Sequence, residues 1–330
     1  MPPWTLDSRE QLFTGALVAG ADRTTLVDDF KGRGYTVAHF SGQDESYGDS
    51  VSRLGLARAD FLYDARQDVE RRTSRSVAPV SLQVSWKTLL SRMDDFLAAW
   101  HDSGPLYLYV NIVDSHFPYW HPEIDPILPG PELRRSDIRE RNADHVRAGY
   151  ANSAANVDLA VARVVAAFRQ RIGGDDHAIL VTADHGQALY EEGLLGHGQS
   201  LAEEQTRVPF ILWGVGGDWP EPLGPADVRQ LLLRNLDGRE GGDPPRARFV
   251  PDPERRVLQY VPSLSNPSRI ALQGLDDRLE YRFGDRLARV ARDGSRVSLP
   301  SSGPAFERLV WRWETLQRRS EGFPDTPKDQ

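Results

Sequence analysis

The chain has 330 residues, of which 39% are hydrophobic and 27% charged, and its formal net charge is −8. This composition is typical of a globular protein long enough for one large or two smaller domains, and its acidity excludes a general attraction to nucleic acid or anionic lipid. The lack of cysteine excludes disulfides and thiolate metal sites, and no apolar run approaches the roughly 20 residues that span a bilayer.

The first motif follows the N-terminus almost at once. Thr5 is followed by Ser8, Arg9 and Glu10, a pattern that suits the start of a helix with Thr5 as its N-cap. Thr5 also offers a hydroxyl group, which is a weak nucleophile at neutral pH unless it is activated. Arg9 could hold that hydroxyl or an anion through its fork of donors. The two interpretations are compatible, because a helix N-terminus presents amides to anions.

The next region predicts a helix, a glycine and then a strand. Residues 24–34 form the helix and 35–40 the strand, an order that fits a doubly wound sheet. The polar loop that follows contains Asp44 and Glu45, which could be ligands, but we expect a solvated loop. Residues 86–100 predict an amphipathic helix.

Residues 106–113 predict a buried central strand, because they are apolar on both faces except for Asn111. The strand ends in Asp114-Ser-His116-Phe-Pro-Tyr119, so polar residues reach its carboxyl edge. Histidine suits proton transfer near neutral pH, so His116 is either a general acid or anion ligand, or a structural histidine. His121 is a weaker candidate, and a helix is expected over 150–168.

A second apolar strand, residues 178–182, leads into Asp184, His185 and Gly186, and His197 follows between two glycines. Carboxylate oxygen and imidazole nitrogen suit zinc, manganese or a similar divalent ion. Alternatively, Asp184 caps the following segment and His185 is an ordinary polar residue, because Asp-His-Gly alone is a common tripeptide.

The remainder predicts a strand, a helix and then a small antiparallel sheet closed by a further helix. The strand covers 208–213, the helix 227–236, the sheet strands 256–261, 268–273, 279–283 and 287–290, and the closing helix 306–316.

Three segments together resemble the signature of the sulfatase branch of the alkaline phosphatase superfamily: Thr-Ala-Asp-His-Gly at 182–186, Gly-Leu-Leu-Gly-His-Gly at 193–198 and Glu-Glu-x-x-Arg-Val-Pro at 203–209. The resemblance includes the N-terminus, where aligning Ser8 and Arg9 with the family pattern puts Thr5 at the nucleophile position. Asp7 replaces the usual proline. Formylglycine made from cysteine is excluded, and the pattern is similar to members that use an unmodified threonine, including phosphoethanolamine and phosphoglycerol transferases.

The resemblance implies an alkaline-phosphatase-like α/β fold, a three-layer α/β/α arrangement with a mostly parallel central sheet and a small C-terminal antiparallel sheet plus helix. It implies a catalytic domain over 1–245 and a C-terminal subdomain over 246–330. One divalent ion (Zn, Mn, Ca or Mg) would be bound by Asp184, His185 and Thr5. His197 would lie near the substrate or a second metal, and His116 near the leaving group.

The implied activity is hydrolysis or transfer of a phosphate or sulfate ester of a small molecule, glycan or lipid headgroup. Threonine favours phosphoryl chemistry, since sulfate ester hydrolysis in the family usually uses formylglycine. The family's first strand, which supplies acidic metal ligands, has no counterpart before Thr5. We expect a fragment or mis-started frame rather than a truncated relative, and a cytoplasmic protein by default, unless an upstream anchor or signal is missing. The alternative is a catalytically incomplete relative that binds a partner or an anionic glycan.

Overall fold

The computed structural model describes residues 2–17, 24–73, 82–101, 104–130, 132–173, 176–237, 246–284, 287–292, 295–299 and 304–320. The chain divides into two compact units. Unit 1 comprises Met1–Arg23, Ala178–Ala188 and Leu195–Gln330, and unit 2 comprises Thr24–His177 and Leu189–Leu194. The predicted domain boundary at residue 245 stays a prediction.

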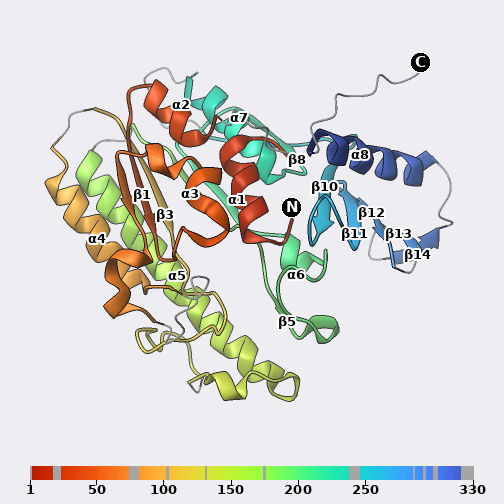
Figure 1. The fold of residues 1–330 in the computed structure, drawn as a ribbon, viewed down its shortest axis with the longest axis horizontal. Helices are drawn as coiled ribbons and strands as arrows, with labels where there is room; N and C mark the ends of the chain where they lie inside the picture. The colour runs from red at the N-terminus through yellow and green to blue at the C-terminus, as the bar shows by residue number, and fades with distance from the viewer. Residues whose placement is uncertain are drawn as a thin grey trace. The chain divides into compact units, whose positions relative to one another are not determined.

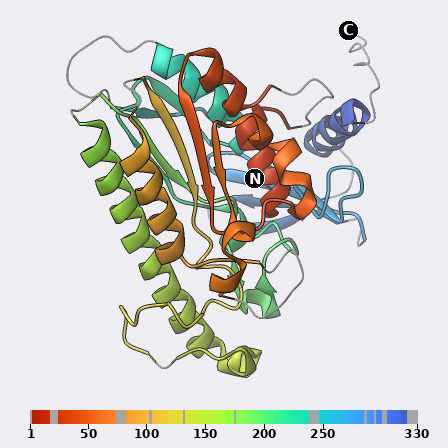
Figure 2. The same cartoon turned by 60° about the vertical axis from the view of Figure 1, so that its left-hand side comes forward.

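Unit 2 contains a parallel sheet in the order β2-β1-β3. The long helix α5 and the helix α4 lie side by side in Figure 2. The core of the unit forms around Phe40, Trp86, Leu89 and Met93, all almost completely buried. The elements are α2 (Leu26–Gly32), β1 (Thr36–Ser41), α3 (Ser50–Arg53), β2 (Phe61–Tyr63), α4 (Trp86–Ala99), β3 (Leu106–Asn111) and α5 (Ala143–Ile172).

Two predictions for unit 2 need correction. The helix expected over 150–168 extends from Ala143 to Ile172. The loop expected to be solvated buries both of its acidic side chains, Asp44 at 4% exposure and Glu45 at 0%. Asp44 accepts hydrogen bonds from the amide and hydroxyl of Ser46, and Glu45 lies 3.7 Å from the Nε2 atom of the buried His39. Buried carboxylates require such partners.

Unit 1 contains the N-terminal helix, the antiparallel strand pair β4–β7, the parallel pair β8–β9 and a five-stranded antiparallel sheet. Figure 1 labels its helices and several of its strands, and colours the chain by residue number. The elements are α1 (Thr5–Thr14), β4 (Ile179–Thr182), α6 (Glu203–Thr206), β7 (Phe210–Trp213), β8 (Asp218–Glu221), α7 (Pro225–Asp237), β9 (Arg248–Pro251), β10 (Val257–Val261), β11 (Arg269–Gln273), β12 (Asp277–Arg282), β13 (Leu287–Arg292), β14 (Ser295–Leu299) and α8 (Pro304–Ser320). The two-residue strands β5 (Ala188–Leu189) and β6 (Leu195–Gly196) lie where the chain passes between the units.

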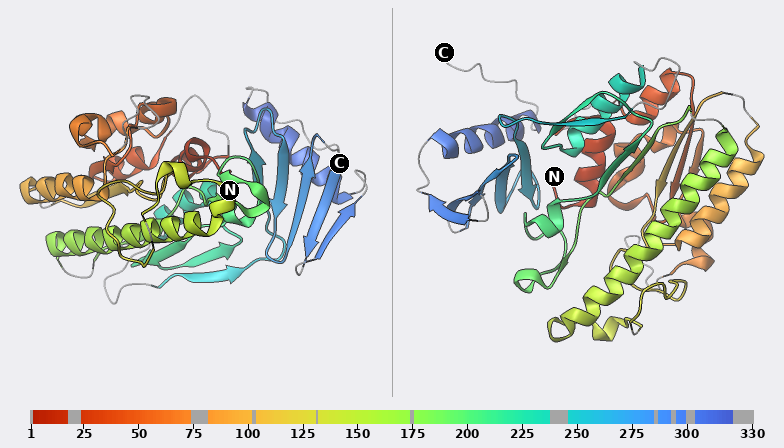
Figure 3. Two further views of the ribbon diagram at one scale, coloured as in Figure 1. Left: turned by 90° about the horizontal axis from the view of Figure 1, so that it is seen from below. Right: turned by 180° about the vertical axis from the view of Figure 1, so that it is seen from behind.

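The predicted C-terminal sheet and closing helix are confirmed. The sheet runs in chain order from β10 to β14, and Figure 3 shows α8 along one of its faces. That face is buried against Leu309 of α8, and its buried side chains are Leu258, Tyr260, Ile270 and Leu279. The prediction missed β14 and the pair β8–β9, while the α/β class and the parallel β2-β1-β3 sheet agree with expectation. None of the helices within the described ranges combines the length and apolar character needed to cross a membrane.

Candidate active site

Helix α1 carries Thr5 and Arg9 in unit 1. Trp4, in an extended conformation, occupies the N-cap position, so the N-cap interpretation of Thr5 is wrong and Thr5 is the first helical residue. Residues four apart share one face of a helix, which puts Thr5 and Arg9 on the same side of α1. Arg9 is 4% exposed. The helix therefore presents a hydroxyl and a buried guanidinium together.

Hydrogen bonds to the rest of unit 1 fix the position of α1. The Gln11 amide donates to the Tyr260 hydroxyl at 3.0 Å, and Arg229 Nη1 donates to the Thr14 carbonyl at 2.8 Å. Burial raises the pKa of Tyr260, and the neighbouring Asp7 carboxylate, which accepts a hydrogen bond from its hydroxyl, raises it further. Asp7, where the family pattern has proline, thus links α1 to β10.

Strand β4 delivers Asp184 and His185 to Thr5. The Thr5 Oγ1 and His185 Nε2 atoms are 3.0 Å apart, although 180 residues separate them in sequence. His185 Nδ1 lies 2.9 Å from the Gly186 carbonyl oxygen. Because that oxygen can only accept, Nδ1 carries a proton, and in the neutral ring Nε2 has a lone pair directed at Thr5.

Gly186 permits a close backbone approach just after this histidine. Its amide donates to the Gln205 carbonyl at 3.0 Å, and an added Cβ would lie 2.0 Å from the Glu204 carbonyl oxygen. A larger residue would therefore displace either the end of β4 or helix α6. This close approach at Gly186 fixes the backbone that carries Asp184 and His185.

Asp184 is held as a carboxylate. Burial raises its pKa, but His185, Arg9, a hydrogen bond from Thr5 and His197 together lower it below the usual value. Its side chain keeps 31% exposure, and Oδ2 lies 3.6 Å from His185 Nε2. The single Thr5 proton therefore has two acceptors within reach.

His197 completes the cluster. Its ring stacks on the His185 ring, with centroids 3.7 Å apart and planes at 26°. Its Nδ1 atom lies 3.3 Å from the Gln187 side-chain oxygen, and the Trp4 ring centroid is 5.8 Å away. An added Cβ on Gly198 would lie 2.4 Å from the Trp4 ring, so the glycine lets the indole pack beside His197. The sequence analysis did not identify Trp4 and Gln187 as site residues. The only indication in the sequence is that Trp4 directly precedes Thr5 and that Gln187 lies two residues after His185.

His116 belongs to unit 2, where it follows β3. Its Nδ1 atom donates to the Phe117 carbonyl at 2.9 Å, and its backbone amide donates to the Val113 carbonyl at 2.9 Å. His121 is 8% exposed and donates from Nε2 to Asp114 Oδ1 at 3.0 Å, since its Nδ1 accepts from the Glu123 amide. His121 therefore orients Asp114, while the role of His116 stays a prediction.

The donors fit part of a metal site. In the described ranges there is no group of three or more His, Cys, Asp or Glu side chains that could bind a metal ion. Asp184, His185 and Thr5 instead bring a carboxylate, an imidazole lone pair and a hydroxyl together, at separations of 3.0 and 3.6 Å from the imidazole nitrogen. Ligands on 2.0–2.1 Å tetrahedral bonds lie about 3.3 Å apart. Asp184 Oδ2 and His185 Nε2 both carry lone pairs and lie 3.6 Å apart, an arrangement that a cation between them would stabilise.

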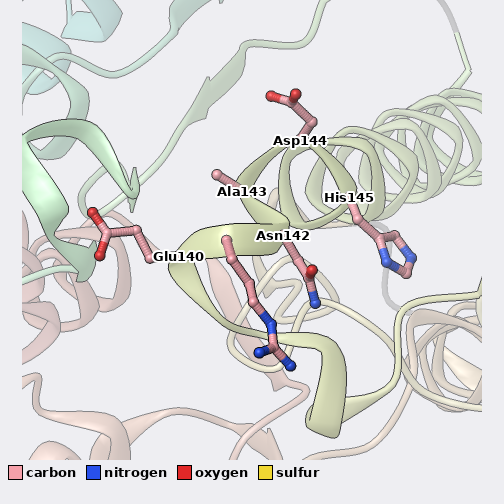
Figure 4. Close-up of a pocket in the computed structure, with 6 residues that line it drawn as sticks. Glu140, Asn142, Ala143, Asp144 and His145 are labelled. Atoms are coloured by element: carbon pink, nitrogen blue, oxygen red, sulfur yellow. The ribbon is translucent and has the colours of Figure 1, made fainter.

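A separate surface depression of about 480 Å³ lies at the N-terminal end of α5 in unit 2 and is lined by residues 140–145. Figure 4 shows the Glu140, Asp144 and His145 side chains pointing in different directions. No predicted site residue lines it, and its polar groups do not converge as those around Thr5 do.

The comparisons with known proteins agree on one family. The family model described as Sulfatase matches residues 3–223. A putative sulfatase from Bacteroides thetaiotaomicron VPI-5482 is 14% identical, with 99% of this chain and 86% of that chain covered and a TM-score of 0.62. The lipoteichoic acid synthase LtaP from Listeria monocytogenes (14%, 98% and 81%, TM-score 0.58) and the phosphonate monoester hydrolase of Agrobacterium radiobacter (14%, 96% and 86%, TM-score 0.53) share the fold. No curated protein sequence matches.

Proposed function

The chain belongs to the sulfatase family, and we propose that it hydrolyses or transfers a phosphate or sulfate ester with Thr5 as nucleophile. The observation that carries this proposal is the 3.0 Å contact between Thr5 Oγ1 and His185 Nε2, beside the Asp184 carboxylate. A hydroxyl whose proton has two acceptors is prepared to lose it. The chain lacks cysteine, so threonine chemistry favours phosphate over sulfate esters.

In the proposed reaction, Thr5 Oγ1 gives its proton to the Asp184 carboxylate and attacks phosphorus or sulfur in line while the bond to the leaving oxygen breaks. Arg9 and protonated His197 neutralise the non-bridging oxygens. The leaving oxygen takes up a proton from solvent. The resulting Thr5 ester is then cleaved by water in a hydrolase, or by a second alcohol in a transferase.

Asp184, His185 and Thr5 are the residues that would bind a divalent ion. Such an ion would supply a Lewis acid that favours the ionised hydroxyl and offsets negative charge in the transition state. Imidazole and carboxylate donors admit Zn or Mn, while Ca and Mg prefer oxygen ligands.

The experiment is metal analysis of the purified chain together with turnover of an aryl phosphate, a phosphodiester and an aryl sulfate after addition of Zn, Mn, Ca or Mg. We expect turnover of one ester class that needs the metal and that Thr5→Ala abolishes while metal content is retained. Turnover by Thr5→Ala near the level of the unaltered chain would exclude Thr5 as nucleophile.

A second candidate is a non-catalytic protein that uses the same cluster to bind an anionic partner or glycan. The observation in its favour is that the described ranges bring only two metal-binding His or Asp side chains to Thr5. Binding of orthophosphate without metal uptake or turnover of any ester would favour it. Turnover that depends on Thr5 would exclude it.

A further inference from the structure

The antiparallel sheet of unit 1 has one apolar and one arginine-rich face. In the register of β11, β12 and β13, Arg269, Arg278, Arg282 and Arg289 share the face with Glu280, opposite the face that packs on α8. We call this group the arginine face. Apolar burial against α8 stabilises the sheet through its other face. This burial does not explain why arginines gather on the arginine face.

Three of these arginines meet one carboxylate. Glu280 Oε1 lies 3.1 Å from Arg282 Nε and 3.9 Å from Arg269 Nη1, and Glu280 Oε2 lies 3.5 Å from Arg278 Nη2. The four side chains are only 13–24% exposed. Three guanidinium groups and one carboxylate give this cluster an excess of positive charge in a half-buried setting, where charge is weakly screened.

The strand register makes this arrangement unfavourable for the sheet alone. Arg269 lies directly opposite Arg282, and like charges at directly opposite positions destabilise an antiparallel pair. Glu280 offsets part of this repulsion, and its cross-strand neighbour on β13, Arg289, adds a fourth arginine to this face. A surface shaped only for stability would alternate the two signs of charge. The pattern therefore points to an anionic ligand.

The arginine face continues into the segment that carries His197. Leu201 is completely buried against Val261 and Ala271, which lie on the same face of the sheet. Arg269 Nη1 lies 3.5 Å from the Ser200 hydroxyl. Ser200 follows His197 by three residues, which span at most about 11 Å of backbone. Arg269 thus lies beside the segment that leads to His197 in the candidate active site.

We propose that Arg269, Arg278 and Arg282 bind a second anionic group of the substrate, so that the enzyme prefers an ester that carries a further phosphate, sulfate or carboxylate beyond the reacting one. Guanidinium groups bind all three anions through paired hydrogen bonds. This inference rests on the proposed function in that it takes the bound molecule to be a substrate. The anion site itself is argued from the sheet alone, and anion binding to it can be measured without turnover.

The binding experiment uses calorimetry on the full chain with inorganic tripolyphosphate, a sulfated disaccharide and orthophosphate. We expect the two polyanions to bind more tightly than orthophosphate, and the double variant Arg269→Gln, Arg282→Gln to lose about tenfold or more of that affinity. Glu280→Gln should strengthen polyanion binding because it removes the competing carboxylate. The matched control, Arg248→Gln, removes an exposed arginine on β9 that pairs with Asp218 and should change nothing.

The two polyanions separate phosphate from sulfate as the preferred second group. Equal polyanion affinity in the double variant and the unaltered chain, or an equal loss in Arg248→Gln, would overturn the proposal, provided thermal melting shows folded protein. Weaker binding by Glu280→Gln would overturn it as well, and this variant keeps the test valid if the double variant fails to fold.

Turnover separates this proposal from the function on which it rests. With an active enzyme, the double variant should raise KM about tenfold for an ester with a second anionic group, while kcat and the KM for a simple aryl phosphate stay unchanged. If no ester is turned over but the arginine variants still change polyanion binding, the anion site stands and the proposed catalysis fails. If esters are turned over and the variants have no effect on binding or KM, the anion site fails alone.

Discussion

The imidazole rings of His185 and His197 stack with their centroids 3.7 Å apart and their planes at 26°. The stack matters because His185 directs Nε2 at Thr5 while His197 donates from Nδ1 to Gln187. Each ring is therefore fixed by a hydrogen bond on one edge and by the other ring across its face. The stack couples Thr5, through His185, to Gln187, a residue that the sequence pattern alone does not link to Thr5.

The variant His197→Phe tests whether the side chain at this position acts through stacking on His185 or through its hydrogen bond to Gln187. A phenyl ring can keep the contact with His185, so we expect metal affinity to stay within about threefold, while His197→Ala should weaken it by about tenfold or more. Both variants should lose turnover, since neither can neutralise the anion. Metal titration followed by ester turnover checks this, and an equal loss of metal affinity in the two variants would contradict it.

Gln187→Leu should leave the ring stack in place and remove the acceptor for His197 Nδ1. We expect kcat/KM to fall by about tenfold with metal content unchanged, because the histidine loses its fixed orientation but no metal ligand is altered. Gln199, whose side chain donates to the Leu195 carbonyl rather than to a site residue, provides the matched control as Gln199→Leu. A drop in metal content in Gln187→Leu would show that the amide supports His185 instead.

Gly186→Ala should misplace the functional end of β4. The added Cβ would lie 2.0 Å from the Glu204 backbone oxygen, which cannot move as a flexible side chain could. We expect a loss of about 1–3 kcal/mol in the free energy of unfolding, together with lower metal affinity. Gly32→Ala is the control, because a Cβ there meets nothing within 4 Å and Gly32 ends α2. Unfolding in urea compares the two, and similar stability in both would refute the steric argument.

Local pattern was enough to predict the elements that lead to the site. The apolar run before Asp184 and the amphipathic helix from Trp86 each follow a period that needs no distant partner to recognise. The Asp-His-Gly motif likewise indicated a polar cluster at the end of a strand, and the fold brings Thr5 and Arg9 to it within unit 1.

What could not be predicted depends on tertiary contacts that the local pattern does not specify. Glu45 is buried because His39 lies beside it, and a polar loop gives no sign of that neighbour. Helix α5 begins seven residues before its apolar stripe, where Gly149 leaves room for Leu133 to pack against it. The cluster of arginines around Glu280 needs the strand register, since those residues are ordinary charged positions in the sequence.

The Asp68 carboxylate in unit 2 should make stability depend on pH. It accepts two hydrogen bonds from Arg92, at 2.5 and 2.7 Å, and one from the Tyr63 hydroxyl at 2.8 Å. The bonds from Arg92 are the main cause that lowers the pKa of Asp68 to about 2, against the opposing effect of burial. The carboxylate is 1% exposed, but Arg92 is 40% exposed and therefore partly screened by solvent.

The sign follows from this lowered pKa. A group whose pKa falls on folding contributes stability above its unfolded value, about 3.9, and that contribution is lost as pH falls from about 4 toward 2. Asp68→Asn should therefore destabilise the chain by about 1–2 kcal/mol at pH 5 and above, after discounting for screening, and the difference should shrink by pH 3. Urea unfolding at pH 3, 4, 5 and 7 measures it. Asp218→Asn, which breaks an exposed pair with Arg248, is the control and should show no measurable change. A constant difference between the Asp68 variant and the unaltered chain across this range would mean that packing, rather than the charge on Asp68, stabilises the fold.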